Sequence, residues 1–100
     1  MPALAKAVVN GDPVARVDAM EALRSVGPDA GKAAVPQLIE ALKYPDRRVR
    51  SEAAKVLGSF KGAAVAAIPA LEHALGDEDQ EVRDNASQAI LEINQGNREF

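Results

Sequence analysis

The chain of 100 residues contains no cysteine and no tryptophan, and its only aromatic residues are Tyr44, Phe60 and Phe100. A disulfide framework, a thiolate nucleophile and a cysteine metal site are therefore excluded. With so few aromatic residues, the core must be built from aliphatic side chains and from the abundant alanines, which let helices approach closely. This composition favours packed helices over a β-sandwich, whose strands prefer aromatic and β-branched residues.

Long apolar runs are also missing. No stretch approaches the roughly 18 apolar residues that cross a bilayer, and residues 1–5 lack the basic segment and apolar core of a signal peptide. We expect a soluble protein without membrane insertion, cytoplasmic by default. The hydrophobic fraction of 47% is ordinary for one domain with a buried core.

The net charge of −3 is too small to indicate a nucleic-acid partner, but the charges are unevenly distributed. Residues 1–34 carry four basic and four acidic side chains, residues 35–67 carry six and three, and residues 68–100 carry two and eight. A basic middle next to an acidic end gives the molecule an electrical polarity that can orient a partner.

An internal repeat of about 33 residues organises the whole chain. Pro2, Pro36 and Pro69 are 34 and 33 residues apart, and positions counted from each proline match without an insertion inside any unit. The matching positions hold mainly leucine, alanine, aspartate and arginine: Leu4, Leu38 and Leu71; Ala7, Ala41 and Ala74; Val8, Leu42 and Leu75; Asp12, Asp46 and Asp79; Arg16, Arg50 and Arg83; Ala19, Ala53 and Ala86; Leu23, Leu57 and Ile90; Val26, Phe60 and Ile93.

Each unit is predicted to form two helices joined by a polar turn. The proline suits the first turn of the first helix, and the aspartate ten residues later is placed as N-cap of the second. The second helix carries apolar residues with a period of 3.6, and its repeated alanine predicts a close helix crossing. We expect glycines to end the second helices, at Gly27, Gly62 and Gly96.

One such unit cannot bury its apolar face, whereas stacked units share one core. The prediction is therefore an all-α fold, an α-solenoid of three helix-turn-helix units. The expected bounds are about 1–27, 28–61 and 62–95, followed by a tail at 96–100. Because the first helix lacks a lead-in like residues 28–34, we expect an uncapped N-terminal end that packs on a partner subunit or continues a longer array.

The middle unit resembles a HEAT repeat of the PBS-lyase-like subtype, through residues 45–58 and the preceding 35–42. The third unit is similar, while the first is more divergent. The resemblance implies that the second helices line a concave face. It also implies a ladder in which an aspartate two residues before the cap pairs with an arginine of the next repeat, but that position reads Asn10, Tyr44 and Asp77.

Spacing within each unit predicts a different set of ion pairs. Asp12 and Arg16, Asp46 and Arg50, and Asp79 and Arg83 are each four residues apart, which suits local pairs on one helix face.

Catalytic constellations are not visible, so we predict a protein without enzymatic activity, cofactor or metal. His73 is interpreted as a solvated surface residue, with a partner contact or pH sensor as the alternative. The acidic run 77–79 with Glu81 lacks the glycine and distal glutamate of an EF-hand loop, so a solvated turn with one cap is favoured over a cation site.

The side chains of the second helices that point away from the apolar stripe are the predicted partner surface. Gly58 falls in this set without a side chain to offer. The predicted binding residues are Val14, Val17, Glu21, Arg24, Arg48, Ser51, Lys55, Glu81, Asp84, Gln88 and Leu91. Val14 and Val17 mark either a partner footprint or a rotated, partly buried helix.

These features favour a non-catalytic protein-interaction module, either a scaffold or adaptor or an accessory subunit, whose partner is another protein. Binding to a nucleic-acid backbone through the basic middle unit is one alternative, which the acidic third unit disfavours. A lyase-like or chaperone role is the other, and it rests only on resemblance to enzymes that attach bilin chromophores.

Overall fold

The computed structural model describes residues 13–26 and 32–98. These residues form helices joined by short turns and contain no strand, which confirms the all-α prediction. The elements are α2 (Pro13–Val26), η1 (Lys32–Ala34), α4 (Val35–Ala41), α5 (Arg47–Ser59), η2 (Lys61–Ala67), α6 (Ile68–Ala74) and α7 (Gln80–Arg98). The predicted first helix of the first unit, Asp12 and Gly27 lie outside the described residues.

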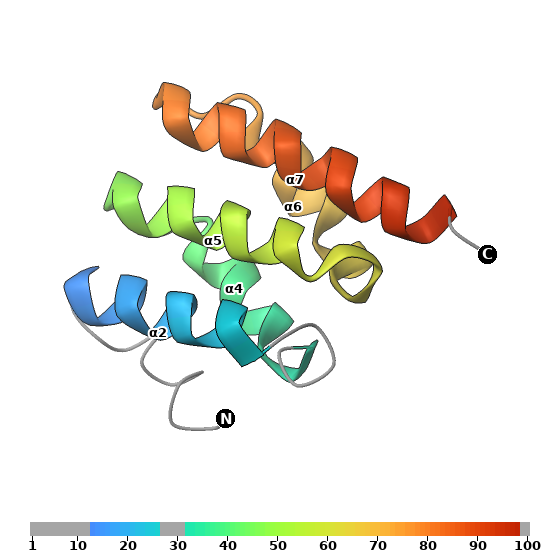
Figure 1. Ribbon diagram of the computed structural model, residues 1–100. Helices are drawn as coiled ribbons and strands as arrows, with labels where there is room; N and C mark the ends of the chain where they lie inside the picture. Colours follow the sequence, from blue (N-terminus) through green and yellow to red (C-terminus); the bar gives the residue numbers. More distant parts are fainter. Residues whose placement is uncertain (1–12, 27–31, 99–100) are drawn as a thin grey trace.

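The helices form two layers (Figure 1). Helices α2, α5 and α7 lie side by side in the second-helix layer, and α4 and α6 lie in the layer behind them. Helix α5 contacts α2 on one side and α7 on the other. Within the described ranges, no helix has both the length and the apolar character needed to cross a membrane.

The predicted helix starts are confirmed. Pro36 and Pro69 lie in the first turns of α4 and α6, where a missing N–H leaves no helical bond unmade. Asp46 caps α5 by accepting a hydrogen bond of 2.8 Å from the backbone N–H of Arg48. Asp79 caps α7 in the same way, accepting from the N–H of Val82 at 3.1 Å.

The core follows the repeated apolar positions. Ala19, Ala53 and Ala86 are at most 4% exposed, as expected for a close helix crossing. The apolar stripe of the middle unit is also buried, at Val49, Ala53, Val56, Leu57 and Phe60. The matching leucines at the ends of α4 and α6 differ, because Leu42 is 6% exposed while Leu75 is 43% exposed.

Two predicted helix ends are wrong. Helix α5 ends at Ser59, and Lys61 rather than Gly62 adopts the left-handed conformation, with φ 53°. Gly62 instead lies inside η2. Helix α7 continues through Gly96 to Arg98, so the tail predicted to begin at residue 96 is helical up to 98.

The solvent-facing orientation predicted for Ser51 and Gly58 is also wrong, since both are buried. A Cβ on Gly58 would lie 2.8 Å from the Cα of Ala89, so α5 and α7 meet at this glycine. The physical reason is that a second helix in a stack is covered by the neighbouring second helices as well as by its own first helix. A helical-wheel projection with one buried stripe assigns the side that faces the next unit to solvent.

The arginine of the middle unit joins neighbouring units instead of forming the predicted local pair. The guanidinium of Arg50 binds both carboxylate oxygens of Asp77, with Nε to Oδ2 at 2.8 Å and Nη2 to Oδ1 at 3.1 Å. It also donates to the carbonyls of Tyr44 and Pro45 in its own turn. The pair therefore links an aspartate to the preceding unit's arginine, opposite to the expected direction.

Tyr44 of the second unit occupies the position that Asp77 has in the third unit. The guanidinium carbon of Arg16 lies 3.7 Å from the centroid of the Tyr44 ring, which is a cation–π contact. Arg83 donates to the carbonyl of Asp77, as Arg50 does to that of Tyr44. The local pair predicted for Asp79 and Arg83 is absent among the described residues, and Asp79 is 3.5 Å from Arg47.

Candidate functional site

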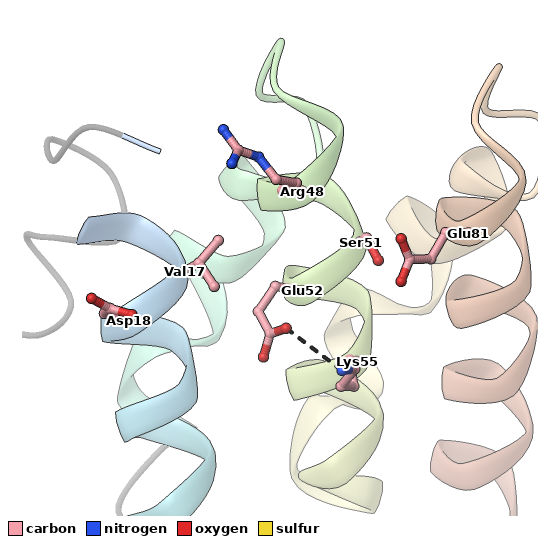
Figure 2. Close-up of a pocket in the computed structure, with 7 residues that line it drawn as sticks. All are labelled: Val17, Asp18, Arg48, Ser51, Glu52, Lys55 and Glu81. Carbon is pink, nitrogen blue, oxygen red and sulfur yellow. Dashed lines mark ion pairs between the residues drawn. The ribbon is translucent and has the colours of Figure 1, made fainter. Parts of the chain in front are cut away.

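A pocket of about 350 Å³ opens on the second-helix layer, and we call it the central pocket (Figure 2). All three second helices contribute to its wall. Helix α2 supplies Val17 and Asp18, helix α7 supplies Glu81, and helix α5 supplies Arg48, Ser51, Glu52 and Lys55.

The structure brings five of the predicted binding residues together at this pocket: Val17, Arg48, Ser51, Lys55 and Glu81. Glu21, Arg24 and Gln88 are exposed on the same helices without lining it. Asp84 and Leu91 are exposed on α7, at the repeat positions of Ser51 and Gly58, so they lie on the side of α7 away from α5. The side chain of Val14 lies outside the described part of the structure.

Val17 is half-buried and packs against the core. It therefore forms an apolar wall of the central pocket (Figure 2). Of its two interpretations, the structure supports partial burial, and that burial is compatible with a partner contact at the part left exposed.

Asp18 and Glu52 are pocket residues that the helical wheel did not select. They occupy matching positions of the first two units, and the third unit has Asn85 there. A position that is polar in every unit is a signal that could have identified them. The helical-wheel projection did not assign this position to the binding surface, because the position borders the apolar stripe.

Glu52 is the buried acid of the site, with 7% of its surface exposed. Burial raises its pKa above the usual 4.5, and the negative charge of Glu21 acts in the same direction. The positive charges of Lys55 and Arg24 oppose this rise. One carboxylate oxygen, Oε1, lies 3.7 Å from Nζ of Lys55. The other, Oε2, is buried and has no hydrogen-bond partner within residues 13–26 and 32–98.

Basic side chains around the pocket are matched with carboxylates. Arg48 binds both oxygens of Asp46, at 3.3 Å and 3.0 Å, and this contact lowers the pKa of Asp46. Lys55 lies beside Glu52, and Arg47 lies 3.5 Å from the carboxylate of Asp79. Arg47, Arg48 and Lys55 of the middle unit therefore each lie beside a carboxylate of the same chain.

Hydrogen bonds from one side chain join α5 and α7 beside the pocket. The amide Nδ2 of Asn85 donates to the hydroxyl of Ser51 at 2.7 Å and to its carbonyl at 3.1 Å. Ser51 is 5% exposed as a result, and its backbone position is tied to α7. A specific polar contact therefore joins the two helices at the pocket.

The acidic turn before α7 is engaged by protein groups. Asp77 binds Arg50 and accepts from the N–H of Asp79, while Asp79 caps α7. The expectation of a solvated turn is wrong for Asp77, whose side chain is 13% exposed. In residues 13–26 and 32–98, no group of three or more His, Asp or Glu side chains is placed to hold a metal ion, and His73 is exposed.

A family model described as HEAT repeats matches residues 1–91. A search of curated proteins found no match to the chain. The matched range covers both layers and every residue of the central pocket.

Proposed function

Since the chain belongs to the HEAT-repeat family, whose repeats commonly act as protein-interaction scaffolds, we propose that it binds another protein on its second-helix layer. The observation that carries this proposal is the central pocket, to which α2, α5 and α7 all contribute side chains. A surface built from successive units positions its groups rigidly, because each helix is held by its neighbours.

The chemistry of the surface also supports a protein partner. Charged side chains of both signs surround the pocket, and Val17 adds an apolar contact at its wall. Mixed charge of this kind gives orientation and specificity to a protein interface. HEAT repeats are in general non-enzymatic, which agrees with a role in binding rather than in catalysis.

Nucleic-acid binding has less support. It would require Arg47, Arg48 and Lys55 to present free positive charge to phosphates, and each of them lies beside a carboxylate. The carboxylates of Glu52 and Glu81 in the same pocket would repel a phosphate backbone. Binding to generic duplex that weakens steeply with salt would be the sign of this alternative.

Site-specific photo-cross-linking tests the proposed surface. A photoreactive amino acid at Lys55 or Gln88 would probe the second-helix layer, and matched variants at Glu40 and Glu72 would probe the exposed side of α4 and α6. We expect partner cross-links in a native extract from the first pair only. Cross-links mainly from Glu40 and Glu72 would contradict the proposal.

A further inference from the structure

An unmet hydrogen-bond acceptor in the central pocket indicates the chemistry of the partner, and this inference rests on the proposed function. The side chain of Glu52 is only 9% exposed, and its buried Oε2 has no hydrogen-bond partner among the residues that the structure describes. Figure 2 shows this carboxylate extending from α5 towards α2, into the space beside Val17. Buried polar atoms are almost always hydrogen-bonded in folded proteins, so this oxygen can accept a hydrogen bond from a group that enters the pocket.

The charges that line the pocket favour a cation. Asp18, Glu52 and Glu81 contribute three carboxylates, against the two basic groups of Arg48 and Lys55. Arg48 is held by both oxygens of Asp46, so its charge is already balanced. Lys55 is 3.7 Å from the nearer oxygen of Glu52, beyond the usual hydrogen-bond length, and its side chain is 49% exposed. It therefore balances Glu52 only in part.

A guanidinium group fits these conditions better than an ammonium group. It is more weakly hydrated, so it loses less on entering a partly closed site, and its planar array of N–H donors can bind a carboxylate through two bonds. The methylene stem of an arginine side chain can also pack on the exposed part of Val17. We propose that the central pocket receives an arginine side chain of the partner protein, anchored by the carboxylate of Glu52.

Peptide titration followed by NMR tests this proposal on the whole chain. The probe is the blocked tripeptide acetyl-Gly-Arg-Gly-amide, and the control is the same peptide with citrulline, which keeps the shape of arginine but not its charge. We expect saturable shifts of the backbone amides of Val17, Ser51 and Glu52 with the arginine peptide. Equal shifts with both peptides, or none with either, would overturn the proposal.

Two variants of opposite effect show whether Glu52 is the anchor. Glu52→Gln keeps the size of the side chain and is expected to weaken binding of the arginine peptide at least tenfold. Lys55→Gln removes the competing cation and is expected to strengthen binding several-fold. The amide spectrum of each free variant reports its fold, and unchanged affinity in a folded Glu52→Gln variant would refute the anchor.

A second readout distinguishes ligand contact from a structural effect. The charged groups that act on Glu52 are Glu21 and Arg24 on α2 and Lys55 on α5. Asp18, Arg48 and Glu81 line the same pocket. A bound guanidinium adds a positive charge among them, so the pKa of Glu52 should fall when the arginine peptide binds. Carboxyl carbon shifts measured against pH would show this fall, and a Glu52 pKa unmoved by saturating peptide would count against the site.

Failure of this inference differs from failure of the proposed function. If the partner cross-links to Lys55 and Gln88 variants but Glu52→Gln leaves its binding unchanged, the surface is correct and the arginine anchor is wrong. If cross-links come from Glu40 and Glu72 instead, the second-helix layer is not the binding surface, even if the arginine peptide binds to the pocket.

Discussion

Asp77 joins the second and third units through its pair with Arg50. Its side chain and that of Arg50 are 13% and 11% exposed, and the two are joined by two hydrogen bonds. Replacing Asp77 by Asn leaves a guanidinium largely buried without its counter-charge. We expect a loss of about 2 kcal/mol in the free energy of unfolding, measured by urea denaturation at pH 7.

The same pair sets part of the acid sensitivity of the fold. Burial opposes ionisation of Asp77, but hydrogen bonds from Arg50 and from the N–H of Asp79 outweigh it and hold its pKa below the usual 3.8. This stabilisation is complete above pH 3.8 and is lost as the pH falls through the lowered pKa. The matched control is Glu78→Gln, an exposed change in the same turn that should alter stability by less than about 0.5 kcal/mol.

The ionisation of Glu52 is expected to lower the stability of the fold, whereas that of Asp77 raises it. Its pKa in the folded state is raised, mainly by burial. Just above pH 4.5 the folded protein therefore binds more protons than the unfolded chain. The free energy of unfolding falls as the pH rises from 4.5 through the raised pKa. Glu52→Gln should therefore raise the free energy of unfolding at pH 7 by on the order of 1 kcal/mol. The gain should disappear below about pH 4, where glutamate is protonated in both states.

Urea denaturation at pH 7 and pH 4 checks this expectation, with Glu81→Gln as the exposed control from the same pocket. A clear loss of stability in Glu52→Gln at pH 7 would mean that the carboxylate is satisfied within the fold. A gain would mean that Glu52 costs stability where it stands, as residues at binding sites often do.

At the scale of the helix, the crossing of α5 and α7 depends on Gly58. A Cβ at this position would lie 2.6 Å from Oε1 of Glu92 and 2.8 Å from the Cα of Ala89, and the second of these atoms is backbone that cannot turn aside. Alanine is the better helix former by about 1 kcal/mol, but the overlap would push two helices apart. We expect Gly58→Ala to lower the free energy of unfolding by about 1–3 kcal/mol.

Gly76 provides the matched control for this prediction. A Cβ on Gly76 would meet its nearest neighbour, the carbonyl oxygen of His73, at 3.7 Å, which is an ordinary contact. Gly76→Ala should therefore leave stability within about 0.5 kcal/mol of the parent chain in thermal or urea unfolding. If both glycines tolerate alanine equally, the close crossing of α5 and α7 is not required.

Local features of the helices could be predicted from the sequence because they depend on residues next to one another. The prolines at the helix starts and the caps Asp46 and Asp79 are of this kind. The residue with the left-handed conformation after α5 could not be predicted from neighbouring residues, because Gly62 was the better local candidate. Lys61 adopts that conformation instead, with a backbone φ of 53°, where η2 follows α5.

Contacts between units were harder to predict, since they depend on which side of a helix meets its neighbour. The wheel assigned Ser51 and Gly58 to solvent because it treated α5 as covered on one side only, whereas α7 covers a second side. Tyr44 shows a related limit. It looked like a break in the aspartate ladder, but its ring receives Arg16 where Asp77 receives Arg50. The position is used in the same way with different chemistry.

The whole molecule behaves as a stack in which equivalent residues differ by what covers them. Leu42 and Leu75 occupy the same position of successive units, at the ends of α4 and α6. Leu42 lies next to the turn between α6 and α7 and is 6% exposed, while Leu75 is 43% exposed. The stabilising contribution of a leucine in this fold should therefore be set by the neighbouring unit rather than by its own.

Two single substitutions test this dependence. Leu42→Ala should lower the free energy of unfolding by about 2–4 kcal/mol, because it leaves a cavity between the second and third units. Leu75→Ala, the same chemical change in the same local sequence position, should cost less than about 1 kcal/mol, because much of its side chain is already in water. Urea denaturation of both variants with a common slope gives the comparison. Equal losses would show that Leu75 is buried in solution by a partner that packs on α6. If that partner is a second copy of the chain, the loss caused by Leu75→Ala should depend on protein concentration.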